Sequence, residues 1–399
     1  MTDIKADHQI RLLRGAAEYF DALITAIDNS IYEVRLESYI FSVQDSAEAV
    51  VQALVRAAQR GVAVYLVVDG IGTPGLAAPW PDRLNAAGVQ WRIYRPLGHW
   101  GLLLPSRWRR LHRKLCVVDG MVAFCGGINV LDDLFDLHHG ALPAPRFDFA
   151  VRVTGSLVQD VHATMAQFWW RLQAVQSVRQ VNLPDAWQAL QRVVLDIRTD
   201  TARPGGSGEA RARLVLRDNL RNRSRIERAY RLALGAARHD ILLANAYFLP
   251  GRRIRKGLTH AAQRGVRVRL LLQGRYENFM QYYATRALYG TLLRAGVEIY
   301  EYKASFLHAK VAVVDSHWAT VGSSNMDPLS LLLAREANVV IEDAAFASEL
   351  RHELQLALEH GAQRLDLQQH ARRGLAQKLL DHSALLLMRV LLFISGKRY

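Results

Sequence analysis

The sequence predicts an α/β protein of two similar domains, each a mixed β-sheet flanked by helices, packed about a pseudo-twofold axis around one shared site. The main observation is a repeat: LHRKLCVVDGMVAFCGGIN at residues 111–129 returns as LHAKVAVVDSHWATVGSSN at residues 307–325. Such long self-similarity indicates a duplicated domain. Strand-like and helix-like segments also alternate in both copies, which is typical of α/β layers. Between the copies, TARPGGSGE at residues 201–209 has the composition of a linker.

The elements before the motif repeat in the same order. LVRAAQRGVAVYLVVDG at residues 54–70 matches LTHAAQRGVRVRLLLQG at residues 258–274, and each predicts a helix ended by glycine and followed by a buried strand. Two further strand-like pairs flank these segments: LESYIF with LANAYF (residues 36–41 and 243–248) and AAGVQWRIY with RAGVEIYEY (residues 86–94 and 294–302). The first copy carries about a dozen extra residues within segment 95–110, just before its motif.

Length and composition set the organisation. At 399 residues the chain suits two domains, each large enough to bury a core, and we expect them at residues 1–175 and 211–365. Residues 176–210 would form the linker, and residues 366–399 an apolar and basic tail. Half of the residues are hydrophobic and 22% are charged, which indicates a globular protein.

Charge and targeting signals indicate the partner and the compartment. The formal net charge of +14 favours a polyanionic partner, either nucleic acid or an anionic membrane surface. Cys116 and Cys125 lie in apolar surroundings and are expected in the core, which suits a reducing compartment. The first fifteen residues contain no apolar signal region, and no apolar run is long enough to span a bilayer.

The repeated motif places the same polar side chains twice. His112 and Lys114 are two residues apart and therefore share one face of a strand, as do His308 and Lys310. Each copy then supplies an aspartate, a small residue and an asparagine at matching positions: Asp119, Gly127 and Asn129 in the first copy, and Asp315, Ser323 and Asn325 in the second. Pairing of the two copies would bring two histidines, two lysines and two asparagines to one anion.

This set of side chains suits transfer at a phosphodiester. Lysines, amide groups and the Gly127 and Ser323 turns can hold the non-bridging oxygens of phosphate. One imidazole can attack phosphorus, while the other acts as general acid and base. A lysine beside each histidine disfavours a bound cation, so we expect neither metal nor cofactor. LDDLFDLHH at residues 131–139 groups aspartates with histidines, but its spacing matches no familiar metal site, and we favour a solvated loop.

The doubled HxKxxxxD motif, followed by GGxN or GSxN, resembles the phospholipase D superfamily. The similarity sharpens in LLANAYFLPG and in residues 297–343, which resemble the B-type bacterial cardiolipin synthases that lack N-terminal transmembrane helices. The resemblance implies a phosphohistidine intermediate, with His112 as nucleophile and His308 as acid and base. It also implies that Asp148 and Glu336 orient the histidines. Asp119 and Asp315 complete the motif, yet their distance from the lysines leads us to expect that they brace strand ends. Leu329 stands where many members have arginine.

The resemblance implies a lipid substrate, and two segments have the composition of interfacial membrane contacts. They are RPLGHWGLLLPSRWRR at residues 95–110 and SALLLMRVLLFISGKRY at residues 383–399, in which Arg389, Lys397 and Arg398 interrupt or follow apolar residues. A buried loop and a core helix are the alternatives. We expect a peripheral protein on the cytoplasmic face of the bacterial inner membrane.

Four functions remain open from the sequence. The leading hypothesis is cardiolipin synthesis, in which two phosphatidylglycerol molecules give cardiolipin and glycerol. A phospholipase D that uses water, a nuclease of the same superfamily, and a non-catalytic basic binding protein are the alternatives. The apolar and basic segments favour phosphatidylglycerol and other anionic phospholipids over nucleic acid, and binding alone does not require two histidines. The oligomeric state cannot be inferred.

Overall fold

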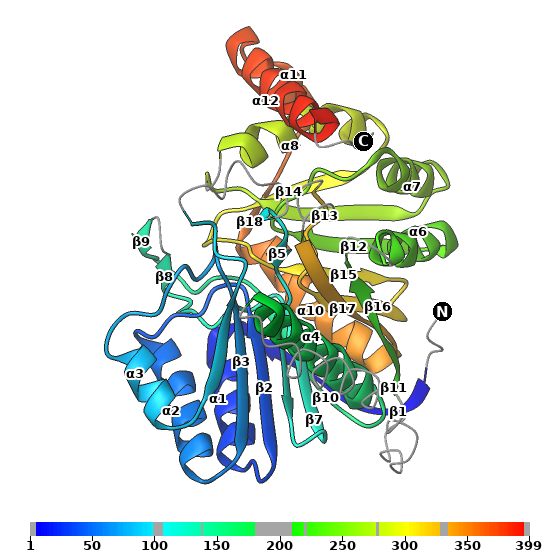
Figure 1. The fold of residues 1–399 in the computed structure, drawn as a ribbon. Helices are drawn as coiled ribbons and strands as arrows, with labels where there is room; N and C mark the ends of the chain where they lie inside the picture. The colour runs from blue at the N-terminus through cyan, green and yellow to red at the C-terminus, as the bar shows by residue number, and fades with distance from the viewer. Residues whose placement is uncertain are drawn as a thin grey trace.

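The structure is a computed structural model that describes residues 5–98, 107–136, 139–179, 210–218, 222–276, 279–327 and 334–394 (Figure 1). The first half of the chain runs through β1 (Lys5–Arg14), α1 (Gly15–Asp28), β2 (Glu33–Ser38), α2 (Ser46–Gln59), β3 (Ala63–Asp69), α3 (Trp80–Ala86), β4 (Gln90–Tyr94), β5 (Arg110–Leu111), β6 (Leu115–Val118), β7 (Val122–Gly126), β8 (Phe135–Asp136), β9 (Gly140–Ala141), β10 (Phe149–Thr154) and α4 (Leu157–Arg179).

The second half repeats the order of the main elements. It runs through β11 (Ala210–Arg217), α6 (Arg225–Ala236), β12 (Asp240–Asn245), α7 (Arg252–Gln263), β13 (Arg267–Gln273), α8 (Phe279–Arg294), β14 (Glu298–Tyr302), β15 (Lys310–Val314), β16 (Trp318–Gly322), β17 (Ala334–Glu342), α10 (Ala344–His360) and β18 (Ala362–Arg364). Two helices follow, α11 (Leu367–Ala371) and α12 (Leu375–Ile394).

The strand order confirms the predicted duplication. The first half is ordered β1-β10-β7-β6-β2-β3-β4, and the second half β11-β17-β16-β15-β12-β13-β14, so each strand has a counterpart in the same place. Both halves are mixed sheets, because β2, β3 and β4 run parallel, as do β12, β13 and β14, while the other pairs are antiparallel. Antiparallel pairing of β1 with β11 joins the halves at the pseudo-twofold centre.

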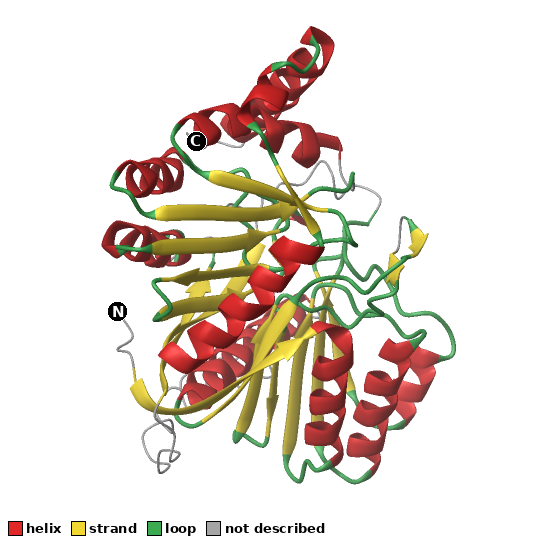
Figure 2. Cartoon of the chain, turned by 180° about the vertical axis from the view of Figure 1, so that it is seen from behind, coloured by secondary structure: helices red, strands yellow, loops and turns green. Residues whose placement is uncertain are grey.

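Apolar side chains form one shared core and two separate ones. The shared core combines residues of β6, β7, β10 and α4 with residues of β12, β15, β16, β17 and α10. The outer face of the first sheet packs against α1, α2 and α3, and that of the second against α6, α7 and α8, as Figure 2 shows from behind. Cys116 and Cys125 are buried free thiols within these cores. Because the central core belongs to both halves, their relative placement is fixed by burial.

The C-terminal segment forms part of a longer helix than the sequence indicated. Helix α12 begins at Leu375, before the predicted apolar and basic segment at residues 383–399, and Ala384, Leu385 and Met388 pack against α8. The core-helix alternative therefore holds for one face of α12. Lys397 and Arg398 of the tail, residues 99–106 of the apolar and basic loop, and Leu329 lie outside the described residues. Among the described helices, none combines the length and the apolar character needed to cross a bilayer.

Candidate active site

The backbone of each histidine is anchored on the opposite half of the molecule. The N–H of His112 donates to the carbonyl of Arg335 at 3.0 Å, where β5 pairs with β17. The N–H of His308 donates to the carbonyl of Phe147 at 2.9 Å. Arg335 directly precedes Glu336, and Phe147 directly precedes Asp148. These backbone contacts therefore bring each histidine beside a carboxylate of the other half.

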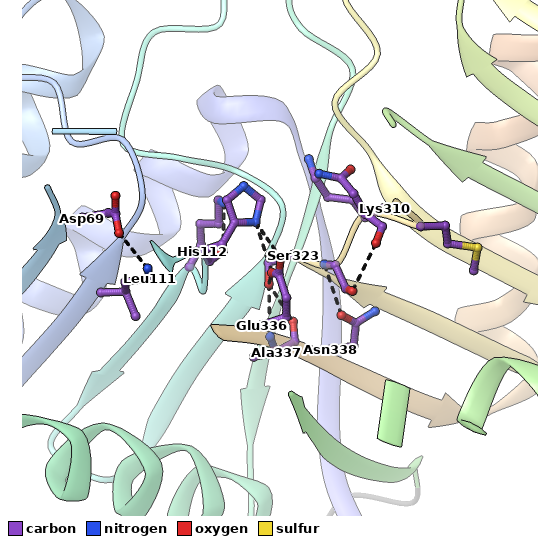
Figure 3. A network of polar contacts seen from close by, with 12 residues as sticks. Asp69, Leu111, His112, Lys310, Ser323, Glu336, Ala337 and Asn338 are labelled. Carbon is purple, nitrogen blue, oxygen red and sulfur yellow. Dashed lines mark hydrogen bonds and ion pairs between the residues drawn. The ribbon is translucent and has the colours of Figure 1, made fainter. Parts of the chain in front are cut away.

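The predicted orienting acids therefore act across the two halves. Nδ1 of His112 lies 3.1 Å from each carboxylate oxygen of Glu336, and Nδ1 of His308 lies 2.6 Å from Oδ2 of Asp148. Glu336 is completely buried and Asp148 nearly so. Figure 3 shows Glu336 between His112 and Ser323. A carboxylate at Nδ1 fixes the ring and leaves Nε2 for chemistry.

The residues predicted to bind phosphate through the motif turns have another task. Oγ of Ser323 donates to the carboxylate of Glu336 at 2.5 Å. A Cβ on Gly127 would lie 2.2 Å from Oδ1 of Asp148, so glycine makes room for that acid. The N–H groups of Gly127 and Ser323 donate to strand carbonyls at 2.9 and 3.0 Å and are engaged there. The two positions are therefore corrected from phosphate ligands to supports of the acids.

Both lysines of the motif are buried at the site. Nζ of Lys114 donates to the carbonyl of His112 at 2.9 Å. Nζ of Lys310 donates to the carbonyl of His308 and lies 2.8 Å from the Nδ1 of that residue. It also lies 3.8 Å from Oδ2 of Asp148. Two buried ammonium groups next to two imidazoles make a strong site for an anion.

The two asparagines differ in their partners. Oδ1 of Asn129 accepts a hydrogen bond from the N–H of Ile40 at 3.1 Å, so part of that amide stabilises the turn after β2. Asn325 is buried, and no donor among the described residues reaches its Oδ1. Both observations concern amide oxygens, which accept hydrogen bonds, whereas a phosphate oxygen would be bound by the amide N–H₂ group of either residue.

Burial and like charges shift the pKa values of the site. Burial lowers the pKa of His112, and burial, Lys310 and Lys114 lower that of His308 well below its ordinary value. Burial and the charge of Lys310 lower the pKa of Lys114 to about 7. Burial raises the pKa of Asp148 to about 6. A bound phosphate anion would raise the pKa values of the two histidines and of Lys114, because a nearby negative charge stabilises their protonated, positively charged forms.

Asp119 and Asp315 brace strand ends, as their spacing predicted. The carboxylate of Asp119 accepts from the N–H groups of Ile31, Tyr32 and Glu33 at 2.7–2.8 Å. The carboxylate of Asp315 accepts from three successive N–H groups, those of residues 238–240, at 2.8–2.9 Å. Each aspartate ends the motif strand and joins it to the start of the neighbouring strand, β2 or β12.

Sequence reasoning missed several residues that support His112. The ring of Tyr39 lies 4.8 Å from the imidazole of His112. Asp69, at the end of β3, accepts from the N–H of Leu111 at 2.7 Å (Figure 3). It also accepts from the guanidinium of Arg110 at 3.1 Å. The signal lay in the repeats themselves, because LESYIF and LANAYF differ at Tyr39, and LVVDG and LLLQG differ at Asp69.

The acidic segment at residues 131–139 is structural where it is described. Asp132 accepts from Oγ of Ser46 at 2.5 Å near the start of α2. Asp136 lies 2.9 Å from the guanidinium of Arg146 and 3.0 Å from Nδ1 of His139. Within the described ranges, no group of three acidic, histidine or cysteine side chains could hold a metal ion. His138 lies outside them.

A duplicated α/β fold with two crossed histidine–acid pairs and two buried lysines defines a phosphotransfer enzyme of the phospholipase D type. The family described as "Cardiolipin synthase, PLD-like domain" matches residues 23–142 and 230–357. Cardiolipin synthase B of Escherichia coli K12 is 36% identical over 90% of this chain and 82% of its own length. The chain belongs to this family of PLD-like cardiolipin synthases, as the motifs predicted.

More distant proteins extend the comparison. Cardiolipin synthase A of Pseudomonas syringae is 29% identical over 86% of this chain and 67% of its own length. Phosphatidylserine synthase of Haemophilus influenzae has a TM-score of 0.65 at 13% identity, covering 98% of this chain and 96% of that one. Polyphosphate kinase of Porphyromonas gingivalis has a TM-score of 0.55 at 14% identity, covering 90% of this chain and 49% of that one. The last two likenesses establish the fold alone.

Proposed function

We propose that the protein transfers a phosphatidyl group between two phosphatidylglycerol molecules, giving cardiolipin and glycerol. The observation that carries the proposal is the crossed arrangement, in which Glu336 holds His112 and Asp148 holds His308. It supplies two oriented imidazoles beside two buried ammonium groups. Membership of the cardiolipin synthase family supports this choice of reaction.

The steps use only side chains of the site. Nε2 of His112 attacks phosphorus, the bond to the glycerol oxygen breaks, and His308 donates a proton to that oxygen. The hydroxyl of the second phosphatidylglycerol then gives its proton to His308 as its oxygen attacks phosphorus and the bond to His112 breaks. Lys114, Lys310 and the amide N–H₂ groups of Asn129 and Asn325 hold the non-bridging oxygens and stabilise their charge.

Turnover by purified protein tests the proposal. Vesicles of phosphatidylglycerol should yield cardiolipin and glycerol, detected by mass spectrometry, without added nucleotide. His112→Ala and His308→Ala should each lower the rate by about 10⁴-fold or more, because both steps need both rings. A phosphatidyl adduct trapped on His308 would reverse the assigned roles. Phosphatidic acid as the main product, or cleavage of nucleic acid in place of lipid, would contradict the transferase.

Access to lipid requires contact with a membrane surface, and we propose that α12 provides part of it. One face of α12 packs on α8, while Leu375, Leu379 and Leu386, spaced along the outward face, are 79%, 68% and 63% exposed. Arg389 is exposed beside them. This combination of outward leucines and positive charge suits the surface of an anionic bilayer, such as the cytoplasmic face of a bacterial inner membrane.

Substitution on the outward face tests this contact better than truncation does, since removal of residues 383–399 would also uncover α8. The double change Leu379→Glu and Leu386→Glu should weaken flotation with phosphatidylglycerol liposomes. Turnover of detergent-dispersed lipid should stay the same. Gln377→Glu is the matched control, because Gln377 is also exposed on α12 but lies on the opposite side from Leu379. Equal flotation of all three proteins would contradict a role for α12.

A further inference from the structure

The two halves differ in what lies beside each histidine. Tyr39 follows β2, and Ala246 occupies the matching place after β12, as the alignment of LESYIF with LANAYF shows. The Tyr39 ring covers the imidazole of His112, with ring centres 4.8 Å apart. Gly72 is packed closely against this tyrosine, since a Cβ there would lie 2.3 Å from its carbonyl oxygen. The second half has only a methyl group at this position.

A pocket occupies the space on the second half. It is a small recess, partly open to solvent, between the ends of β12 and β13 and helix α8. Ala246 lies in its wall, and the buried Phe248 and Leu272 supply apolar surface. Gln273 and Gln281 contribute amides, and Arg275 a guanidinium.

The pocket is adjacent to His308 through two backbone contacts. Oε1 of Gln273 accepts from the N–H of Leu307 at 3.4 Å, directly before the histidine. The N–H of Ala246 donates to the carbonyl of Ala309 at 3.0 Å, directly after it. In the first half, the side chain at the position of Ala246 faces the histidine ring, so the pseudo-twofold points Ala246 toward His308.

We propose that this pocket binds the polyol headgroup of the lipid substrate, on the alcohol side of the reaction. The assignment rests on the proposed function, in which His308 serves the alcohol. Amides and hydroxyl groups can both donate to and accept from the hydroxyls of a glycerol, while apolar side chains contact its carbon chain. Tyr282 and Thr285 add hydroxyls on the α8 wall. The corresponding space beside His112 is filled by Tyr39, so the site accepts a headgroup from one side only.

This placement suits both half-reactions. When His112 attacks phosphorus, the departing oxygen lies on the opposite side, where His308 protonates it. The released glycerol leaves the pocket, and the alcohol of the next lipid enters the same place and returns its proton to His308. The alcohol that leaves phosphorus and the alcohol that attacks it therefore occupy the same recess in turn.

Headgroup exchange isolates this step. Incubation of phosphatidylglycerol with deuterated glycerol should transfer the deuterium label into the lipid. Incubation of phosphatidylmethanol with deuterated methanol should also label the lipid. Methanol is too small to need the pocket, so this second reaction reports the chemistry alone. Ala246→Tyr gives the second half the ring of the first. We expect it to raise KM for glycerol by at least about tenfold and to leave methanol exchange within about twofold of the parent.

A second variant removes a contact without filling the pocket. Gln281→Ala, on the α8 wall, should also impair glycerol exchange and spare methanol exchange. Equal loss of both exchanges in Ala246→Tyr and in Gln281→Ala, or full retention of glycerol exchange in both, would overturn the pocket assignment. An unmodified protein that exchanges neither alcohol and makes no cardiolipin would instead contradict the proposed function.

Discussion

Replacement of Gly127 by alanine should disable the site through a residue that touches no substrate. The added Cβ would lie 2.2 Å from Oδ1 and 2.7 Å from Oδ2 of Asp148, whereas ordinary contacts begin at 3.4 Å. Gly127 is not among the glycines of positive φ, so the backbone itself tolerates alanine. The whole effect therefore falls on the carboxylate that orients His308.

The size of the effect follows from these distances. To reach ordinary contact, Oδ1 of Asp148 must move by roughly 1.2 Å, and Oδ2, which makes the 2.6 Å contact with His308, must move by roughly 0.7 Å. The carboxylate as a whole is therefore displaced by about 1 Å from the position in which it orients His308. Misplacement of a catalytic group by about 1 Å costs about 10²-fold in rate. We expect kcat to fall by that factor while KM for lipid changes little.

The assay is turnover of detergent-dispersed phosphatidylglycerol, with circular dichroism and thermal unfolding as checks of the fold. Gly75→Ala is the matched control, because a Cβ at Gly75 meets nothing within 4 Å. Full activity of Gly127→Ala, with a melting temperature equal to that of the control variant, would refute the view that Asp148 must reach His308.

Two further predictions concern pH. Because the pKa of Asp148 is raised to about 6, the folded state holds a proton that the unfolded state releases at lower pH. The stability that this bound proton contributes should decline as pH rises from about 4 toward 6. In Asp148→Asn, the urea concentration at the unfolding midpoint should depend less on pH over that range. Because the pKa of Lys114 is lowered to about 7, turnover should fall above that pH as its ammonium is lost. Lys114→Arg, which keeps its charge, should move this alkaline limb upward, and an unmoved limb would assign it to another group.

Most of the fold could be predicted because the same order of helix-like and strand-like segments occurs in both halves of the sequence. Matching segments at residues 54–70 and 258–274 each predicted a helix followed by a buried strand, and the structure places these strands, β3 and β13, at equivalent positions. The bracing role of Asp119 was also accessible, since its distance from Lys114 along a strand puts it at the other end. These inferences depend on local periodicity alone.

Features that depend on how the halves dock were not predicted. Sequence named Glu336 and Asp148 as orienting acids but did not reveal that each serves the histidine of the other half. That pairing arises from tertiary contacts, such as the β5–β17 pairing that holds His112. The role of Gly127 was likewise invisible, because a close approach between side chains leaves no trace in spacing. The packing of Ala384, Leu385 and Met388 of α12 on α8 is a tertiary contact of the same kind.

The crossed acids explain why the chain needs the motif twice. Each half contains a histidine without its own carboxylate and a carboxylate without its own histidine, so neither half alone holds an oriented imidazole. Once both halves are required, their equivalent positions are free to diverge, because each serves a different step of the proposed mechanism. Tyr39 opposite Ala246 is such a divergence: a ring lies beside His112, whereas Ala246 lines a recess in the second half, which we propose to be the headgroup side. In the proposed mechanism, the residues shared by both halves bind the phosphate, and the residues that differ between the halves determine which histidine serves the alcohol.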